Sequence, residues 1–125
     1  MGSNNPKPNK QKASVKLLTE YRAVLWQKSA FEAVSGNESK FLLDCLERIN
    51  QTQKIVECLK NHKRLGDKMY WIIYATFMTE KQPIDMYEIL SIIADKYEAI
   101  PRRTYFRLKK CALEMLDAQL SDVPP

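Results

Sequence analysis

Glycine and histidine are scarce in this sequence, and their scarcity argues against several kinds of catalytic site. Only three of the 125 residues are glycine, and they form no glycine-rich loop of the kind that cradles a nucleotide phosphate. The single histidine, His62, can build neither a multi-histidine metal site nor, from a polar loop, a serine–histidine pair. We therefore expect no enzyme, no cofactor and no metal centre.

Cysteine pairs and long apolar runs are missing as well. Cys45, Cys58 and Cys111 are odd in number and far apart, which predicts neither a disulfide framework nor a zinc ribbon and fits a reducing cytoplasm. The N-terminus has no apolar signal-peptide core. The longest uncharged apolar stretch, residues 69–79, is well short of the roughly 20 residues that a membrane helix needs. We expect a soluble cytoplasmic protein with no membrane partner.

What the sequence does contain is typical of a small helical domain with an uneven charge. Hydrophobic residues make up 45% and charged residues 28%, a globular composition that favours an all-α fold. The formal charge of +5 is concentrated in two places. Residues 1–16 contain four lysines and no acid, and residues 96–110 contain six basic residues and one acid. Because the rest of the chain is mildly acidic, this asymmetry indicates a surface for a polyanion.

Hydrophobic periodicity predicts about five helices. Residues 1–13 read as a disordered basic tail and 121–125 as a second disordered tail. Between them we expect an N-terminal helical pair over 14–66, for dimerisation or partner contact, and a DNA-binding helix-turn-helix domain over 67–120. The helices are expected at 14–34, 38–62, 68–79, from about 86, and from Pro101 to about 120.

Capping signals mark most of the boundaries. Ser14 is a candidate N-cap, and Ser35 with Glu38 has the spacing of a capping box. Gly66 is expected to terminate the second helix and Asp67 to cap the third. For the fourth helix, Asp85 and Glu88 repeat the capping-box spacing, and Ile84 and Ile89 occupy the positions of a hydrophobic staple. For the fifth, Pro101 suits a first helical position.

The second helix carries a short heptad seam. Its members are Leu42, Cys45, Ile49, Thr52, Val56 and Leu59. Such a seam packs either within its own chain or between two copies, which leaves a homodimer through the helix at about 38–62 as an alternative. The third helix is apolar nearly all round, through Met69, Tyr70, Trp71, Ile72, Ile73, Tyr74, Phe77 and Met78, and must lie at the centre of a core.

The fifth helix separates apolar from basic residues. Its inward stripe is expected to consist of Tyr105, Leu108, Ala112, Met115 and Leu116. Arg103, Arg107 and Lys110 fall on the opposite side, and Arg102 and Phe106 flank them near the helix start. A helix that follows a helix and a turn, with basic residues in its N-terminal half, is typical of a recognition helix in the major groove of double-stranded DNA.

Each candidate has a chemical reason to contact DNA. The arginine fork of Arg102, Arg103 or Arg107 matches guanine O6 and N7 together. Lys109 and Lys110 suit phosphate, where a flexible point charge is enough. Phe106 either contacts a thymine methyl or tucks beneath the preceding helix, and Thr104 either donates to phosphate or helps to complete the helix start.

The sequence also resembles a known family at these residues. "IPRRTYFRLKKCALEML" resembles the C-terminal helix of phage late-transcription regulators of the ArpU and RinA type, in which "ISRRTYYRxKxxAL" recurs, and "YWIIYATFMT" resembles their aromatic core helix. Region four of bacterial sigma factors looks similar. The resemblance covers about residues 69–120. Pro101 replaces the usual serine cap, and residues 87–100 are longer than a minimal sigma-like motif.

The resemblance implies a phage or prophage transcription regulator in a bacterial cytoplasm, with a sigma region-four-like helix-turn-helix and with RNA polymerase as a further partner. By position it implies DNA contact for Arg102, Arg103, Thr104, Arg107 and Lys110, and core roles for Tyr105, Ala112 and Leu113. Two alternatives remain: a helical protein-interaction module that does not bind DNA, whose basic face is only solvated, and a small-terminase-like DNA-packaging component.

Overall fold

The computed structural model describes residues 12–35 and 40–121, and in these ranges it is all-α with five α-helices and no strand, as predicted. The predictions for the two tails therefore lie largely outside the described residues, as does the Glu38 half of the proposed capping box. The elements are α1 (Ala13–Ser35), α2 (Lys40–Glu57), the 3₁₀ turn η1 (Cys58–Asn61), α3 (Gly66–Ile73), the π-helical segment η2 (Tyr74–Met78), α4 (Met86–Lys96) and α5 (Arg102–Ser121).

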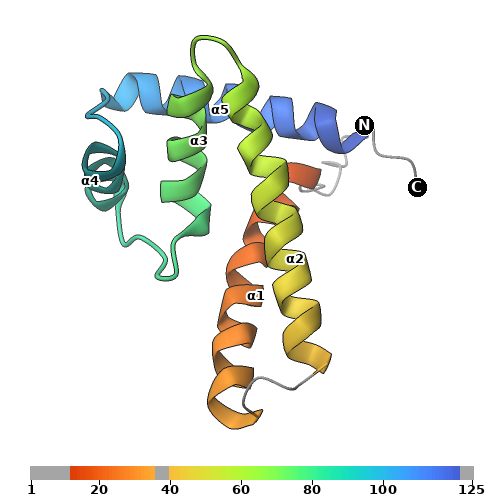
Figure 1. Ribbon diagram of the computed structural model, residues 1–125. Coiled ribbons are helices and arrows are strands. Elements are labelled where there is room, and N and C mark those ends of the chain that lie inside the picture. The colour runs from red at the N-terminus through yellow and green to blue at the C-terminus, as the bar shows by residue number, and fades with distance from the viewer. Residues whose placement is uncertain (1–11, 36–39, 122–125) are drawn as a thin grey trace, which may run out of the picture.

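The helices form a long hairpin and a more compact body. Figure 1 shows α1 and α2 running side by side as an antiparallel pair that projects away from α3, α4 and α5. The body is organised around α3, which packs against α5, whereas α4 packs mainly against η2 and α3. The first half of α1 also reaches α5. One hydrophobic cluster therefore includes residues from the hairpin and from the body.

The heptad seam, which runs along α2 and ends at Leu59 in η1, is buried inside this chain. All six of its residues, from Leu42 to Leu59, are buried, and α2 makes its main packing contact with α1. Opposite the seam, α1 buries Leu18, Tyr21 and Val24. The intrachain alternative is confirmed for these residues.

The aromatic segment lies at the centre of the body, as predicted. Met69, Ile72 and Ile73 of α3 and Ala75 and Met78 of η2 are buried, and α5 packs against α3. The four aromatic side chains of the segment are half-buried around this centre, at Tyr70, Trp71, Tyr74 and Phe77.

The Ser14 cap predicted for the first helix is wrong. α1 begins at Ala13, and Ser14 is completely buried, with no hydrogen-bond partner for its Oγ among the described residues. The cap comes instead from α5, because Asp117 Oδ1 accepts a 2.9 Å hydrogen bond from the Ser14 backbone N–H. A carboxylate at this end of α1 also complements the helix dipole.

Gly66 begins α3, which corrects both the prediction that it ends the second helix and the prediction that Asp67 caps the third. α2 ends at Glu57 and is followed by η1. Gly66 is required there by a close approach of two backbone segments. A Cβ at this position would lie 2.6 Å from the Leu59 carbonyl oxygen and 2.8 Å from that of Lys60.

The start of α4 confirms one part of its predicted signal and contradicts another. Asp85 is the N-cap, and its Oδ1 accepts a 3.0 Å hydrogen bond from Glu88 N–H. The Glu88 carboxylate accepts a 2.8 Å hydrogen bond from the N–H of Ile84, which is one residue before the cap. The predicted hydrophobic staple does not form, because Ile84 is 90% exposed.

We expect Gly66→Ala to lower the free energy of unfolding by about 1 to 3 kcal/mol, because the new methyl group must displace backbone carbonyls. Urea denaturation followed by circular dichroism measures this change. Ser91→Ala, at an exposed position of α4, is the control, since alanine there should be neutral or slightly stabilising. Equal or higher stability of Gly66→Ala would contradict the close packing.

Candidate nucleic-acid interface

The buried face of α5 determines which of its residues reach solvent. Tyr105, Leu108, Ala112 and Leu116 are almost completely buried, which confirms four of the five predicted inward residues. Met115 is the exception, because 37% of it is exposed. Leu113, for which the resemblance implies a core role, is half-buried against the core.

The opposite side of α5 is a basic face, formed by Arg102, Arg103, Arg107 and Lys110. All four side chains are exposed. None of them forms an ion pair with any carboxylate in the part of the chain that the structure describes, whereas Lys28, Arg48 and Lys68 pair with Glu32, Glu20 and Glu98 respectively. The basic face therefore keeps its positive charge without a neutralising partner from this chain.

The first turn of α5 adds to this positive potential. It contains no acidic residue, although acids at a helix N-terminus are normally stabilising. The Pro101 carbonyl accepts a 3.0 Å hydrogen bond from Tyr105 N–H, so Pro101 stands at the cap and α5 begins one residue later than predicted. Proline has no side-chain oxygen with which to cap the first-turn N–H groups. Two arginines at the positive end of a helix dipole disfavour the free helix and favour a bound anion.

Phe106 is part buried and part accessible. Its ring packs edge-on against Tyr105, with 5.1 Å between ring centroids, and 47% of the residue is exposed. The Arg102 guanidinium carbon lies 5.7 Å from the Phe106 ring centroid. The ring is therefore fixed at the helix start and still presents apolar surface next to an arginine.

Lys109 and Thr104 occupy a different position from the basic face. Both are half-buried. Lys109 Nζ lies 5.8 Å from the Phe77 ring centroid and 5.9 Å from that of Tyr105, so its ammonium group is held beside the aromatic core. The seven predicted site residues thus form one exposed basic group, one half-exposed aromatic ring and two residues at the flank.

Tyr105 anchors α5 to η2. Its hydroxyl lies 2.7 Å from Thr76 Oγ1, and Thr76 Oγ1 itself donates a 2.7 Å hydrogen bond to the Ile72 carbonyl. Because a threonine hydroxyl has only one hydrogen, the Tyr105 hydroxyl must donate to Thr76. Burial raises the pKa of the Tyr105 phenol above its usual value.

A second basic segment, the α2–α3 connection (residues 58–65), lies beside α5. It contains the exposed residues Lys60, Lys63 and Arg64, and η1 packs against α5. The sequence pattern does not connect these residues with α5, because they lie between the second and third helices and only the fold brings this segment beside α5. The available signal was a run of three basic residues without an acid.

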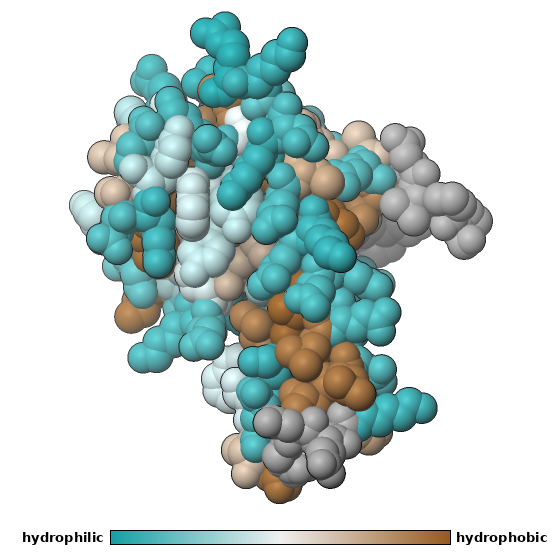
Figure 2. All heavy atoms as spheres, in the orientation of Figure 1, coloured by the Kyte–Doolittle hydropathy of each residue, from teal (hydrophilic) through white to brown (hydrophobic). Residues whose placement is uncertain are grey.

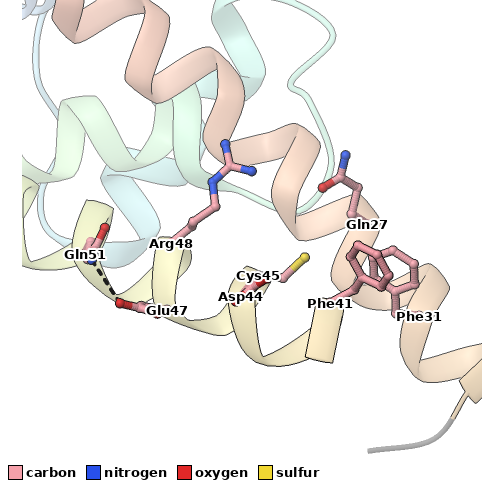
Figure 3. A pocket seen from close by; sticks show the side chains of 8 residues that line it. All are labelled: Gln27, Phe31, Phe41, Asp44, Cys45, Glu47, Arg48 and Gln51. Atoms are coloured by element: carbon pink, nitrogen blue, oxygen red, sulfur yellow. Dashed lines mark hydrogen bonds between the residues drawn. The ribbon is translucent and has the colours of Figure 1, made fainter. Parts of the chain in front are cut away.

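The hairpin also carries an open groove of 650 Å³ on one side, shown in Figure 3. Phe31 of α1 stacks on Phe41 of α2 at one end, with 5.6 Å between ring centroids, and Gln51 donates a 3.4 Å hydrogen bond to Glu47 at the other. Cys45 and Arg48 lie between them. Asp44, Glu47 and Arg48 line this groove, so it does not carry charge of a single sign as the basic face of α5 does.

Within residues 12–35 and 40–121, no helix is long and apolar enough to cross a membrane, and no three histidine, cysteine or acidic side chains gather as metal ligands would. A comparison of the chain with protein-family models, curated proteins and solved structures finds no significant match.

We expect Tyr105→Phe to lower the free energy of unfolding by about 0.5 to 1.5 kcal/mol at neutral pH, because Thr76 loses its hydrogen-bond donor. The wild type should lose further stability as the pH rises above the usual tyrosine pKa of 10.0 and through the raised pKa of Tyr105, since ionisation removes the donated proton.

The measurement is denaturant unfolding of both proteins at pH 8 and again above pH 10. Their difference in stability should shrink at the higher pH. Tyr87→Phe, at an 85% exposed residue, is the control, and it should change stability little at either pH. A constant difference between wild type and Tyr105→Phe would contradict this account of the bond.

Proposed function

We propose that this protein is a sequence-specific DNA-binding regulator of transcription, derived from a phage or prophage, that reads double-stranded DNA with the start of α5. The observation that supports this most is the exposed, unpaired basic face of α5. Its opposite face is fixed in the core, and α4 and a five-residue connection precede it, in the order of a helix-turn-helix.

The proposed contacts follow from the side chains. Arg102, Arg103 and Arg107 pair with guanine edges in the major groove, where a planar fork can bind O6 and N7 together. Lys110 and the N–H groups in the first turn of α5, which contains no acid, bind phosphate. Phe106, half-exposed beside Arg102, contacts a thymine methyl group. Thr104 and Lys109 at the flank bind phosphate at the groove edge.

The resemblance of the α5 sequence to ArpU- and RinA-type regulators and to sigma region four supports a role at promoters in the bacterial cytoplasm, with RNA polymerase as a further partner. The hairpin projects away from α3, α4 and α5 and leaves the start of α5 free (Figure 1). A homodimer through the helix at 38–62 would have to use the outward side of α2, because α1 fills its seam.

The second candidate is a helical protein-interaction module, and exposed apolar residues on the hairpin favour it. Trp26 is 73% exposed on α1, and Val34, Phe41 and Leu43 are also largely exposed. Figure 2 shows hydrophobic side chains gathered over this part of the molecule. This candidate predicts little affinity for any DNA, whereas a small-terminase-like packaging component predicts a ring-shaped oligomer with DNA affinity.

The test is selection of bound fragments from random and genomic DNA across a salt series, followed by sequencing. We expect salt-sensitive binding that enriches one motif. No binding at low salt would contradict DNA recognition and favour the interaction module, and light scattering identifies a ring.

Within an enriched motif, we expect Arg103→Ala and Arg107→Ala each to weaken binding by about 1 to 3 kcal/mol and to relax the preference at one position, as the loss of a guanine contact should. Fluorescence anisotropy with base-substituted sites measures both effects. Lys54→Ala, at an exposed position of α2, is the matched control and should change little. An equal loss on every sequence would instead identify these arginines as phosphate contacts.

A further inference from the structure

We propose that the α2–α3 connection is a second contact with the DNA backbone, in which Lys63 and Arg64 bind phosphates beside the segment read by α5. This inference rests on the proposed function of α5. It adds a part of the chain that neither the sequence pattern nor the resemblance includes.

The packing of η1 and of the neighbouring start of α3 places the connection beside α5 and the segment before it. η1 packs directly against α5. Beyond the connection, Lys68 Nζ lies 3.9 Å from Glu98 Oε2, in the segment that joins α4 to α5. In Figure 1 the connection forms the loop that extends past α5 at the top of the molecule.

The charge of the connection matches that of the basic face. Lys60, Lys63 and Arg64 are exposed, and residues 58–65 contain no acid. Lys60 Nζ lies over the Tyr70 ring, 4.1 Å from its centroid, so its ammonium group is held close to the protein surface. Lys63 and Arg64 form no ion pair with any residue that the structure describes. Figure 2 shows hydrophilic side chains over this end of the molecule.

The connection is held in a fixed shape, unlike an ordinary solvated loop. His62 N–H donates to the Leu59 carbonyl at 3.1 Å, Gly66 N–H donates to the His62 carbonyl at 3.2 Å, and Leu65 N–H donates to His62 Nδ1 at 3.2 Å. Gly66 allows the chain to pass against the backbone of η1. Because the backbone is already ordered, Lys63 and Arg64 lose less conformational entropy when they bind a ligand.

These features favour phosphate over a base edge or an acidic protein. The connection flanks α5 and is not its N-terminal end, so when α5 enters the major groove the connection lies over the adjoining backbone. Two neighbouring cations without an acid match the regular row of phosphates on one strand. An α5 anchored on one flank would also be held in a defined orientation on the duplex.

The experiment compares Lys63→Gln/Arg64→Gln with a matched control, Lys40→Gln/Lys81→Gln. Lys40 begins α2 at the far end of the hairpin, and Lys81 lies in the segment between η2 and α4, so both are remote from the connection in Figure 1. Both control residues are exposed, and both variants lose two positive charges. The measurement is affinity for the enriched motif and for an unrelated duplex across a salt series, with circular dichroism to verify folding.

We expect Lys63→Gln/Arg64→Gln to bind both duplexes about 10- to 60-fold more weakly at about 0.1 M salt. The slope of log affinity against log salt should be smaller by about 1 to 2, as for the loss of one or two phosphate contacts. The preferred motif should not change, and the control variant should stay close to the wild type.

Other outcomes separate this inference from the proposed function. If the wild type binds its motif and the two variants behave alike, the α2–α3 connection does not touch DNA while the role of α5 stands. A changed motif in Lys63→Gln/Arg64→Gln would overturn the assignment to phosphate, because it indicates a base contact. If the wild type binds no DNA at low salt, the proposed function fails and this inference fails with it.

Discussion

The packing of Tyr105 against α3 and η2 determines what the rest of α5 can present to solvent. The ring is buried, and its hydroxyl hydrogen bonds to Thr76, so the rotation of α5 about its own axis is fixed at this point. Leu108, Ala112 and Leu116 continue the same stripe along the helix. Because side chains on a helix recur every 3.6 residues, this stripe places Arg103, Arg107 and Lys110 on the outside. The basic face is thus a geometric consequence of the core.

Arg22 joins the projecting hairpin to the body. Its guanidinium donates to the Thr79 carbonyl at 3.0 Å, to the Thr76 carbonyl at 3.3 Å and to Thr79 Oγ1 at 3.2 Å. These carbonyls lie at the end of η2, where backbone acceptors lack partners within the helix. Thr76 Oγ1 also accepts the hydrogen bond that the Tyr105 hydroxyl donates. The same short segment therefore orients both the hairpin and α5.

The sequence predicted those features that depend on neighbours along the chain. The Asp85 cap, the buried seam of α2 and four inward residues of α5 all follow from spacings of three or four residues. The predictions that failed depend on distant parts of the fold. Ser14 is a good cap by residue type, but Asp117 supplies the cap from α5. Gly66 is of a residue type that often ends helices, but here its lack of a side chain allows close contact with the backbone of η1. The position of Lys63 and Arg64 beside α5 likewise required the three-dimensional fold.

The hydrogen bond between Ser14 and Asp117 makes the two ends of the described fold depend on each other. It joins residues 103 positions apart, and it supplies the cap of the first helix from the last one. α1 can pair with its sequence neighbour α2 through local contacts, but its first turn gains its cap only from the distant α5. The core is complete only when α5 packs against α1 and α3. The first turn of α1 therefore depends on the docking of α5, and a change that loosens α5 also removes the cap of α1.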